Sequence, residues 1–354
     1  MNACKRLRPS VLFSLLASLG AAACALPSDD AADANARVDA IVVVGTSVTS
    51  ALYTTGELGL TLVPKDASGE AVLAKNLDVK VVLTSHPEIG VEVSSTACTA
   101  PEAGKQHISV GVILDDSGSM GSNDPDVLRK KATIGFLDTL GNDDKVLLTD
   151  YGHTGDDLRD LVCESTNQSG NASCSPPKAM FSADKPALAR AAELISDGGG
   201  TPLYEACVQM VPLVDSVKQG RRGILLLSDG EPNGDEKRDA CHAAAKAAQI
   251  PVFTVGLGPA AEGNPEVDDD AVKVLRELST ETGGSYASAN DAAQLDQLFR
   301  NMGTALARGS CKTTTRITNA SAIAPGSKIR GEVTVGSKGA KATFELVAPR
   351  ASQR

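Results

Sequence analysis

The pattern of apolar and polar positions changes twice along the chain. Between residues 107 and 308, apolar runs of strand length alternate with segments of helical periodicity. The predicted strands are 108–114, 146–148, 223–227 and 251–256, and the predicted helices are 126–140, 186–195, 202–211, 239–249, 270–279 and 291–307. Continuous apolar strands that alternate with helices are typical of a mostly parallel sheet with helices on both faces. We therefore predict an α/β, doubly wound domain over residues 105–310.

The two flanking segments have a different pattern. Residues 38–104 and 311–354 contain short runs rich in Val, Ile and Thr, such as "LDVKVVLTS" and "KIRGEVTVG", separated by turn residues. These all-β segments are expected to form one shared β-sandwich, with the α/β domain inserted between them. The alternative is two separate sheets that pack on the central domain. We favour the shared sandwich, because unpaired strand edges are costly.

The first residues predict export from a bacterial cell. Residues 1–23 have a positive start and an apolar run that is too short to span a membrane, which is typical of a signal peptide. The run ends in "GAAAC", which resembles the lipobox of bacterial lipoproteins, although Ala21 occupies a position where Leu is usual. We expect Cys24 to be lipidated; the alternative is ordinary signal cleavage at the same small residues. Residues 24–37 then form a flexible linker, and the protein lies in the cell envelope, anchored at the outer membrane or cell surface.

Composition narrows the possible partners. The 354-residue chain has a formal net charge of −10, only 3% aromatic residues and no Trp. A negative chain with few aromatic side chains is poorly suited to nucleic acid or to an anionic membrane surface. The lipid on Cys24 is therefore the only membrane attachment that we expect.

Small oxygen-bearing side chains follow the ends of two predicted strands. Asp115, Ser117 and Ser119 follow strand 108–114, Asp229 follows strand 223–227, and Thr201 precedes a predicted helix. Ligands of open α/β sheets bind beyond the carboxyl ends of the strands. These hydroxyls and carboxylates are hard oxygen ligands, which suit Mg²⁺, or Mn²⁺ or Ca²⁺ in its place. A helix N-cap is the alternative for "DDSGSM", but a cap does not require Thr201 or Asp229.

Four motifs in order carry a family resemblance. The segments "DDSGSM", "GGGTPLYEA", "LLLSDGEPNG" and "TGGSYASAND" lie on the elements expected for each. Residues 106–308 therefore resemble the von Willebrand factor type A domain and its metal-ion-dependent adhesion site.

This resemblance implies roles for the five residues. Ser117 and Ser119 bind the ion directly, Thr201 binds it directly in the ligand-ready state, and Asp115 and Asp229 act mainly through water. The ion keeps one open position, which an Asp or Glu of a protein partner can fill. In related ligand-binding domains a shift of the final helix, here 291–307, accompanies the change at the metal.

Six cysteines remain after the signal peptide and Cys24 are set aside. An even number in an oxidising compartment suggests disulfides. In the resembled fold the two ends of the domain lie close together, so we pair Cys98 with Cys311. Cys163 and Cys174 lie close in one polar loop and form the second pair. Cys207 and Cys241 remain, on successive helices expected on the same face of the sheet.

Other acidic residues have two interpretations. Asp150, His153, Asp156 and Asp157 could line the rim of the site or belong to a solvated loop. The run 268–270 could hold calcium, but a negative first helical turn is the more ordinary interpretation.

Catalysis is not expected. Ser117 has no evident base partner, and the scattered histidines contain no His-Glu-x-x-His pair. We expect an exported, metal-dependent module for adhesion or protein capture rather than an enzyme. The alternatives are an assembly or scaffold role in the cell's own envelope and, less favoured, a hydrolase that uses the ion.

Overall fold

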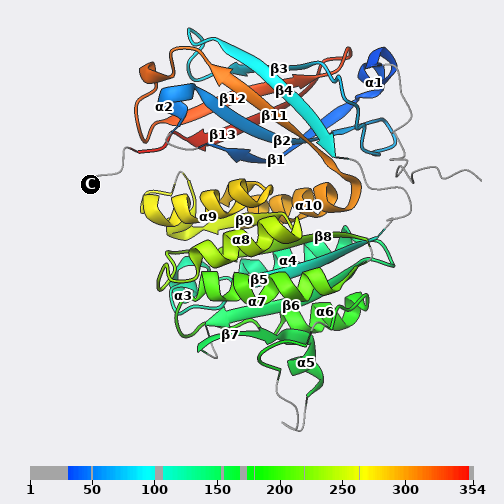
Figure 1. The fold of residues 1–354 in the computed structure, drawn as a ribbon, viewed down its shortest axis with the longest axis vertical. Coiled ribbons are helices and arrows are strands. Elements are labelled where there is room, and N and C mark those ends of the chain that lie inside the picture. Colours follow the sequence, from blue (N-terminus) through cyan, green and yellow to red (C-terminus); the bar gives the residue numbers. More distant parts are fainter. Residues whose placement is uncertain are drawn as a thin grey trace, which may run out of the picture.

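The computed structural model describes residues 31–48, 51–99, 107–152, 155–167, 174–178, 180–218, 220–262 and 264–350. Figure 1 shows a β-sandwich at one end of the molecule and a sheet covered by helices at the other. The large sheet has ten strands in the order β4 (Val91–Thr99), β11 (Ser310–Ile317), β2 (Glu57–Lys65), β1 (Ala40–Ser47), β10 (Tyr286–Ala289), β9 (Val252–Leu257), β8 (Arg221–Ser228), β5 (Ile108–Asp115), β6 (Lys145–Gly152) and β7 (Gly155–Asp160). The small sheet contains β13 (Ala340–Val347), β12 (Lys328–Val335) and β3 (Val79–Leu83).

The central part of the large sheet is parallel, from β10 through β9, β8 and β5 to β6. Three helices cover one face, α4 (Leu128–Asp138), α6 (Lys185–Ala192) and α10 (Ala292–Arg308). The other face packs against α7 (Leu203–Ser216), α8 (Arg238–Ala248) and α9 (Asp269–Thr282). Because both faces are covered, all eight residues of β5 are buried, which explains its unbroken apolar run. The predicted α/β fold class is confirmed.

The sandwich is built from both ends of the chain. Strand β11 lies between β2 and β4, and β12 pairs with β3. Apolar residues of both sheets, among them Leu60, Val81 and Val333, form one core. The shared sandwich is therefore present. Its junction was not expected: β1 pairs with β10 at Thr46 and Tyr286, so one sandwich sheet continues into the central sheet.

The expected flexible linker is wrong for residues Ala31–Arg37, which form helix α1. Ala34 is buried in the sandwich core. The Asn35 amide donates to the carbonyl of Asn76 at 3.1 Å and accepts from the backbone N–H of Asp78 at 2.8 Å. These long-range contacts order a short polar helix that sequence periodicity alone does not predict.

The remaining helical segments are short. They are α2 (Leu52–Thr55), α3 (Met120–Asn123), α5 (Leu161–Thr166) and the 3₁₀ turns η1 (Gly258–Ala260) and η2 (Ala320–Ala322). None of the helices in the described part of the chain is long and apolar enough to cross a membrane. Cys24 and the expected signal peptide lie outside the described residues.

Helix α10 leads directly into the sandwich through Gly309. This glycine has a φ of 93°, and a Cβ there would lie 2.4 Å from the carbonyl oxygen of Thr99. Only glycine combines this backbone with so close an approach. Two residues further, Cys311 of β11 forms a disulfide with Cys98 of β4. The end of α10 is therefore joined to the edge of the sandwich by pairing and by a covalent bond.

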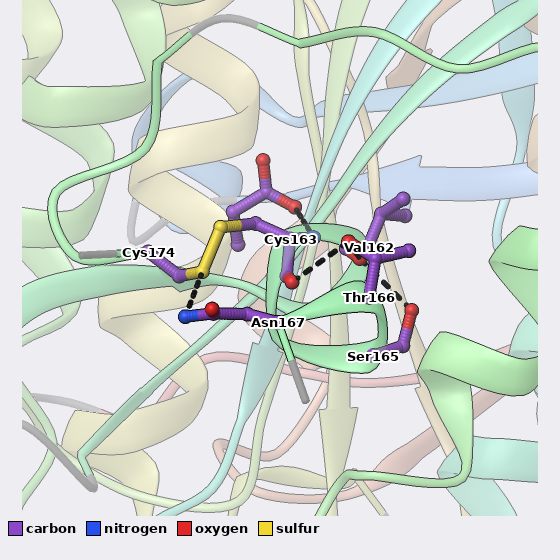
Figure 2. Close-up of a disulfide and its surroundings, with 7 residues drawn as sticks. Val162, Cys163, Ser165, Thr166, Asn167 and Cys174 are labelled. Atoms are coloured by element: carbon purple, nitrogen blue, oxygen red, sulfur yellow. Dashed lines mark hydrogen bonds between the residues drawn. A yellow bond between two sulfur atoms is a disulfide. The ribbon is translucent and has the colours of Figure 1, made fainter. Parts of the chain in front are cut away.

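The other two expected disulfides are also present. Cys207 of α7 is bonded to Cys241 of α8 on the same face of the sheet. Figure 2 shows Cys163 bonded to Cys174 beside α5, with the amide of Asn167 3.9 Å from the Cys174 sulfur. Asp160 begins α5 by accepting the backbone N–H of Cys163 at 3.0 Å. The disulfide therefore joins Cys174 to the first turn of α5, which the Asp160 cap also stabilises.

Candidate metal centre

The carboxylate of Asp115 is fixed at the end of β5. Its side chain is fully buried. One oxygen accepts the backbone N–H of Ser117 at 2.8 Å. The other accepts the hydroxyls of Tyr151 at 2.9 Å and Ser228 at 2.6 Å. Three donors from β6, β8 and the loop after β5 therefore hold this carboxylate in one orientation.

Ser117, Ser119 and Asp229 are joined in one hydrogen-bonded chain. The hydroxyls of the two serines lie 3.1 Å apart, and Ser119 donates to one oxygen of Asp229 at 3.0 Å. The other oxygen of Asp229 accepts from the Asn123 amide of α3 at 2.8 Å. Strands β5 and β8 are parallel neighbours, so their carboxyl ends bring these residues together.

Thr201 approaches from a third loop, just before α7. Its loop meets the first one where the N–H of Gly118 donates to the carbonyl of Gly199 at 3.1 Å. It meets the Asp229 loop through Asn233, whose side-chain oxygen accepts the Thr201 N–H at 2.9 Å. Asp115, Ser117, Ser119 and Asp229 are thus linked by direct hydrogen bonds, and the Thr201 backbone is joined to the Asp229 loop through Asn233.

The buried carboxylates of Asp115 and Asp229 lie close together, and each disfavours the negative charge of the other. Burial and the charge of Asp115 raise the pKa of Asp229 to about 6, although hydrogen bonds from Asn123 and Ser119 lower it. Burial, and then the charge of Asp115, raise the pKa of Tyr151 well above its usual value, so its phenol stays a donor. Three hydroxyls and two crowded carboxylates fit a hard divalent cation such as Mg²⁺.

Sequence reasoning missed the residues that support this centre. Tyr151 and Ser228 hold Asp115, Asn123 holds Asp229, and Asn233 holds the Thr201 backbone. Ser228 and Tyr151 do have a signal, because each lies at the end of a strand that reaches the same edge of the sheet. Asn123 and Asn233 lie beyond their strands, and nothing in their spacing reveals their partners.

Asp150, for which the rim of the site and a solvated loop were both open, is fully buried. It accepts from the Arg159 guanidinium of β7 at 2.9 Å, and the same guanidinium lies 3.1 Å from Asp116. Burial and the charge of Asp150 raise the pKa of Asp116 to about 8, and Arg159 opposes this. His153 lies outside the described residues, and the side chain of Asp156 is not described.

Replacing Arg159 with methionine should destabilise the protein by about 3 kcal/mol, because it leaves the buried carboxylate of Asp150 without its cation. Chemical denaturation at neutral pH measures this. The control is Arg330→Met, which removes an exposed ion pair with Glu345 and should have a much smaller effect. Equal effects of the two substitutions would show that Arg159 does not compensate the buried charge of Asp150.

A family model for the von Willebrand factor type A domain matches residues 109–301, more than half of the 354 residues. The chain belongs to this family. The match includes Asp115, Thr201 and Asp229 and excludes the two flanking β segments. A search of curated protein sequences found no match to the chain.

Several solved structures resemble this von Willebrand factor type A chain. One is a von Willebrand factor type A protein from Catenulispora acidiphila, with 12% identity, a TM-score of 0.45, and coverage of 90% of this chain and 75% of that one. A mutant of the PilB minor pilin from Streptococcus sanguinis has 13% identity, a TM-score of 0.42 and coverage of 75% and 77%. Manganese-loaded TRAP protein from Plasmodium vivax has 14% identity, a TM-score of 0.36 and coverage of 74% and 99%.

A second acidic cluster lies on the surface of this von Willebrand factor type A domain. Carboxylate oxygens of Glu231, Asp268 and Asp270 lie within 4.8 Å of one another, and all three residues are exposed. Burial and the charge of Asp268 raise the pKa of Glu231. Asp268 accepts the N–H groups of Asp270 and Ala271 at the start of α9, so capping accounts for its position. The cluster could hold a cation, but we assign none to it.

Proposed function

We propose that this chain is an exported module that binds a partner protein through a divalent cation. Asp115, Ser117, Ser119, Thr201 and Asp229 would hold the ion, and an Asp or Glu of the partner would complete its coordination. The observation that carries the proposal is the hydrogen-bonded chain from Ser117 through Ser119 to Asp229 at the carboxyl edge of the sheet. Membership of the family supports the same arrangement.

The charge of the donor set favours an acidic ligand. The three hydroxyls contribute no charge, and both oxygens of Asp115 and of Asp229 already accept hydrogen bonds from the protein. The positive charge of an ion held in this way is only partly neutralised by the protein. A carboxylate from a partner is therefore the ligand that gains most by approaching it. Mg²⁺ is the expected ion, and Mn²⁺ or Ca²⁺ can replace it in an oxygen site.

A cross-linking capture experiment tests the proposal. Partner capture should require Mg²⁺, and both EDTA and Ser119→Ala should prevent it. Asp143→Asn is the matched control, because Asp143 is exposed just before β6, at the opposite edge of the sheet. Substitution of each Asp and Glu on the captured protein should then identify one carboxylate whose loss abolishes binding. Capture that persists in EDTA would show that recognition lies elsewhere.

Export and anchoring are part of the proposal. Three disulfides agree with an oxidising compartment. With Cys24 lipidated, the N-terminal β segment would lie between the anchor and the metal centre along the chain.

Cys24→Ala should release the protein from the membrane fraction, because the anchor is the lipid on this cysteine. Fractionation and intact-mass measurement of the mature protein check this. A variant that stays in the membrane fraction with an unchanged mass would contradict lipidation at Cys24.

A further inference from the structure

The segment that carries Thr201 has little structure of its own. Residues 193–202 lie between α6 and α7, outside any helix or strand. Three glycines precede Thr201, and Gly199 has a φ of 80°. Such a segment has many accessible conformations unless other residues restrain it. The position of the Thr201 hydroxyl must therefore be set by contacts outside the segment.

Contacts with the Asp115 loop restrain only the first part of this segment. The N–H of Ser196 donates to the Asp116 carboxylate at 3.1 Å. The N–H of Gly198 donates to the Asp116 carbonyl at 2.7 Å, and the carbonyl of Gly199 accepts the N–H of Gly118 at 3.1 Å. These bonds end at Gly199, two residues before the threonine.

Asn233 restrains the rest. Its side-chain oxygen accepts the Thr201 N–H at 2.9 Å, and its own N–H donates to the Thr201 carbonyl at 2.9 Å. Its amide nitrogen lies over Gly200, where a Cβ would be only 2.3 Å away. Among the residues that the structure describes, no side chain hydrogen-bonds to the Thr201 hydroxyl. Asn233 thus hydrogen-bonds to the backbone of Thr201 and leaves the Thr201 hydroxyl available to an ion.

From these contacts we infer that Asn233 is a positioning residue, which presents the Thr201 hydroxyl to the ion before any partner binds. The inference rests on the proposed function. It explains why Gly200 must lack a side chain, because any Cβ would displace the Asn233 amide. Without the Asn233 side chain the Thr201 N–H loses its acceptor, so the threonine is held by one bond fewer and water takes its place on the ion.

Mn²⁺ alone is the probe, because its effect on water-proton relaxation reports how many waters it binds. Thr201→Ala should add about one water to protein-bound Mn²⁺. Asn233→Ala should add the same water and weaken Mn²⁺ binding about 10-fold to 100-fold. Gly200→Ala should have the same two effects, although residue 233 stays asparagine, because the new Cβ displaces the Asn233 amide. Asn233→Asp keeps the acceptor oxygen and the N–H, so it should keep the wild-type number of waters.

Asn35→Ala is the control, because it also removes an amide side chain that hydrogen-bonds to the backbone, but in the sandwich, where Asn35 makes two such bonds. It should leave the water number unchanged whatever it does to stability. If Thr201→Ala adds a water and Asn233→Ala does not, the positioning role is wrong and the proposed function stands. If Thr201→Ala adds none, Thr201 is not an ion ligand and the inference fails with it. A wild-type protein that binds no Mn²⁺ would instead overturn the proposed function.

Discussion

Replacing Asp229 with asparagine should remove Mg²⁺ binding and leave the ion-free protein at least as stable as the wild type. Asp229 is 1% exposed, and its raised pKa shows that burial and Asp115 both disfavour its charged form. An asparagine has the same shape, removes this charge, and still accepts from Ser119. Asn123 can turn its amide and accept from the new side chain. The affinity for Mg²⁺ should fall by more than about 100-fold, since loss of supporting residues alone costs 10-fold to 100-fold.

The same residue sets a pH dependence. The pKa of Asp229 in the folded, ion-free protein is about 6, above the usual value near 4. A group with a raised pKa stabilises the fold below its unfolded pKa, and this contribution is lost as the pH rises through the folded pKa. The ion-free wild type should therefore lose stability between about pH 4 and pH 6. Asp229→Asn should lose less over this range, because the contribution of Asp229 is gone and that of the raised pKa of Asp116 remains.

Unfolding curves from pH 4.5 to 7.5, in EDTA and in Mg²⁺, measure both effects. The rise in Tm caused by Mg²⁺ should be larger at pH 7 than at pH 5, because protons compete with the ion for Asp229. Asp143→Asn again serves as the control and should behave as the wild type. A Tm of Asp229→Asn that rises in Mg²⁺ as much as the wild-type Tm would contradict the assignment of this residue to the ion.

Loss of the Cys98–Cys311 disulfide should cost about 5 kcal/mol, the largest stability effect of any single bond described. The two cysteines are 213 residues apart in sequence, and the chain-entropy model gives a long loop about 5 kcal/mol. Cys163–Cys174 closes a loop with a separation of only 11 and should contribute about 3 kcal/mol. Chemical denaturation of Cys98→Ser/Cys311→Ser and Cys163→Ser/Cys174→Ser compares them. A larger loss of stability in Cys163→Ser/Cys174→Ser than in Cys98→Ser/Cys311→Ser would contradict the chain-entropy explanation.

The same double variant should change partner affinity less than Thr201→Ala does. Strand β11 also pairs with β2 and β4 along its length, so the end of α10 stays in place when the disulfide is lost. A shift of α10 during ligand binding is hindered by this pairing, and the site should stay near one affinity state. Surface binding of the captured partner to both variants measures this. A larger effect of the disulfide variant would indicate that α10 does move.

The fold could be predicted where burial on both faces gave the sequence an unbroken apolar run, as in β5 and β8. It could not be predicted where the strand is short or polar. Strand β10 has four residues, two of them small alanines, and β7 is an edge strand with the sequence "GDDLRD". The pairing of β1 with β10 depends on one residue pair, for which the pattern of either strand gives no signal.

The candidate site divides in the same way. Asp115 and Asp229 could be placed together because they follow parallel strands, and a strand end is readable from the sequence. Asn233 could not, because its role depends on the course of two loops. Neither the rim nor the solvated loop expected for Asp150 is found, since nothing local in the sequence reveals that Arg159 on the next strand pairs with it. The sequence motifs therefore identify the residues that could bind an ion, but only the structure identifies the residues that position them, such as Asn233.

Strands β4 and β11 are antiparallel neighbours, with Thr99 opposite Ser310 and Cys98 opposite Cys311. For the sandwich, the whole segment from residue 100 to 309 is therefore the loop of a hairpin. A loop can grow at small entropic cost when its ends stay together, and here the ends are also covalently joined. Any domain whose termini lie equally close could occupy the same position without altering a strand pair of that hairpin. A lineage could thus exchange the whole inserted domain as one continuous stretch of gene while keeping its sandwich.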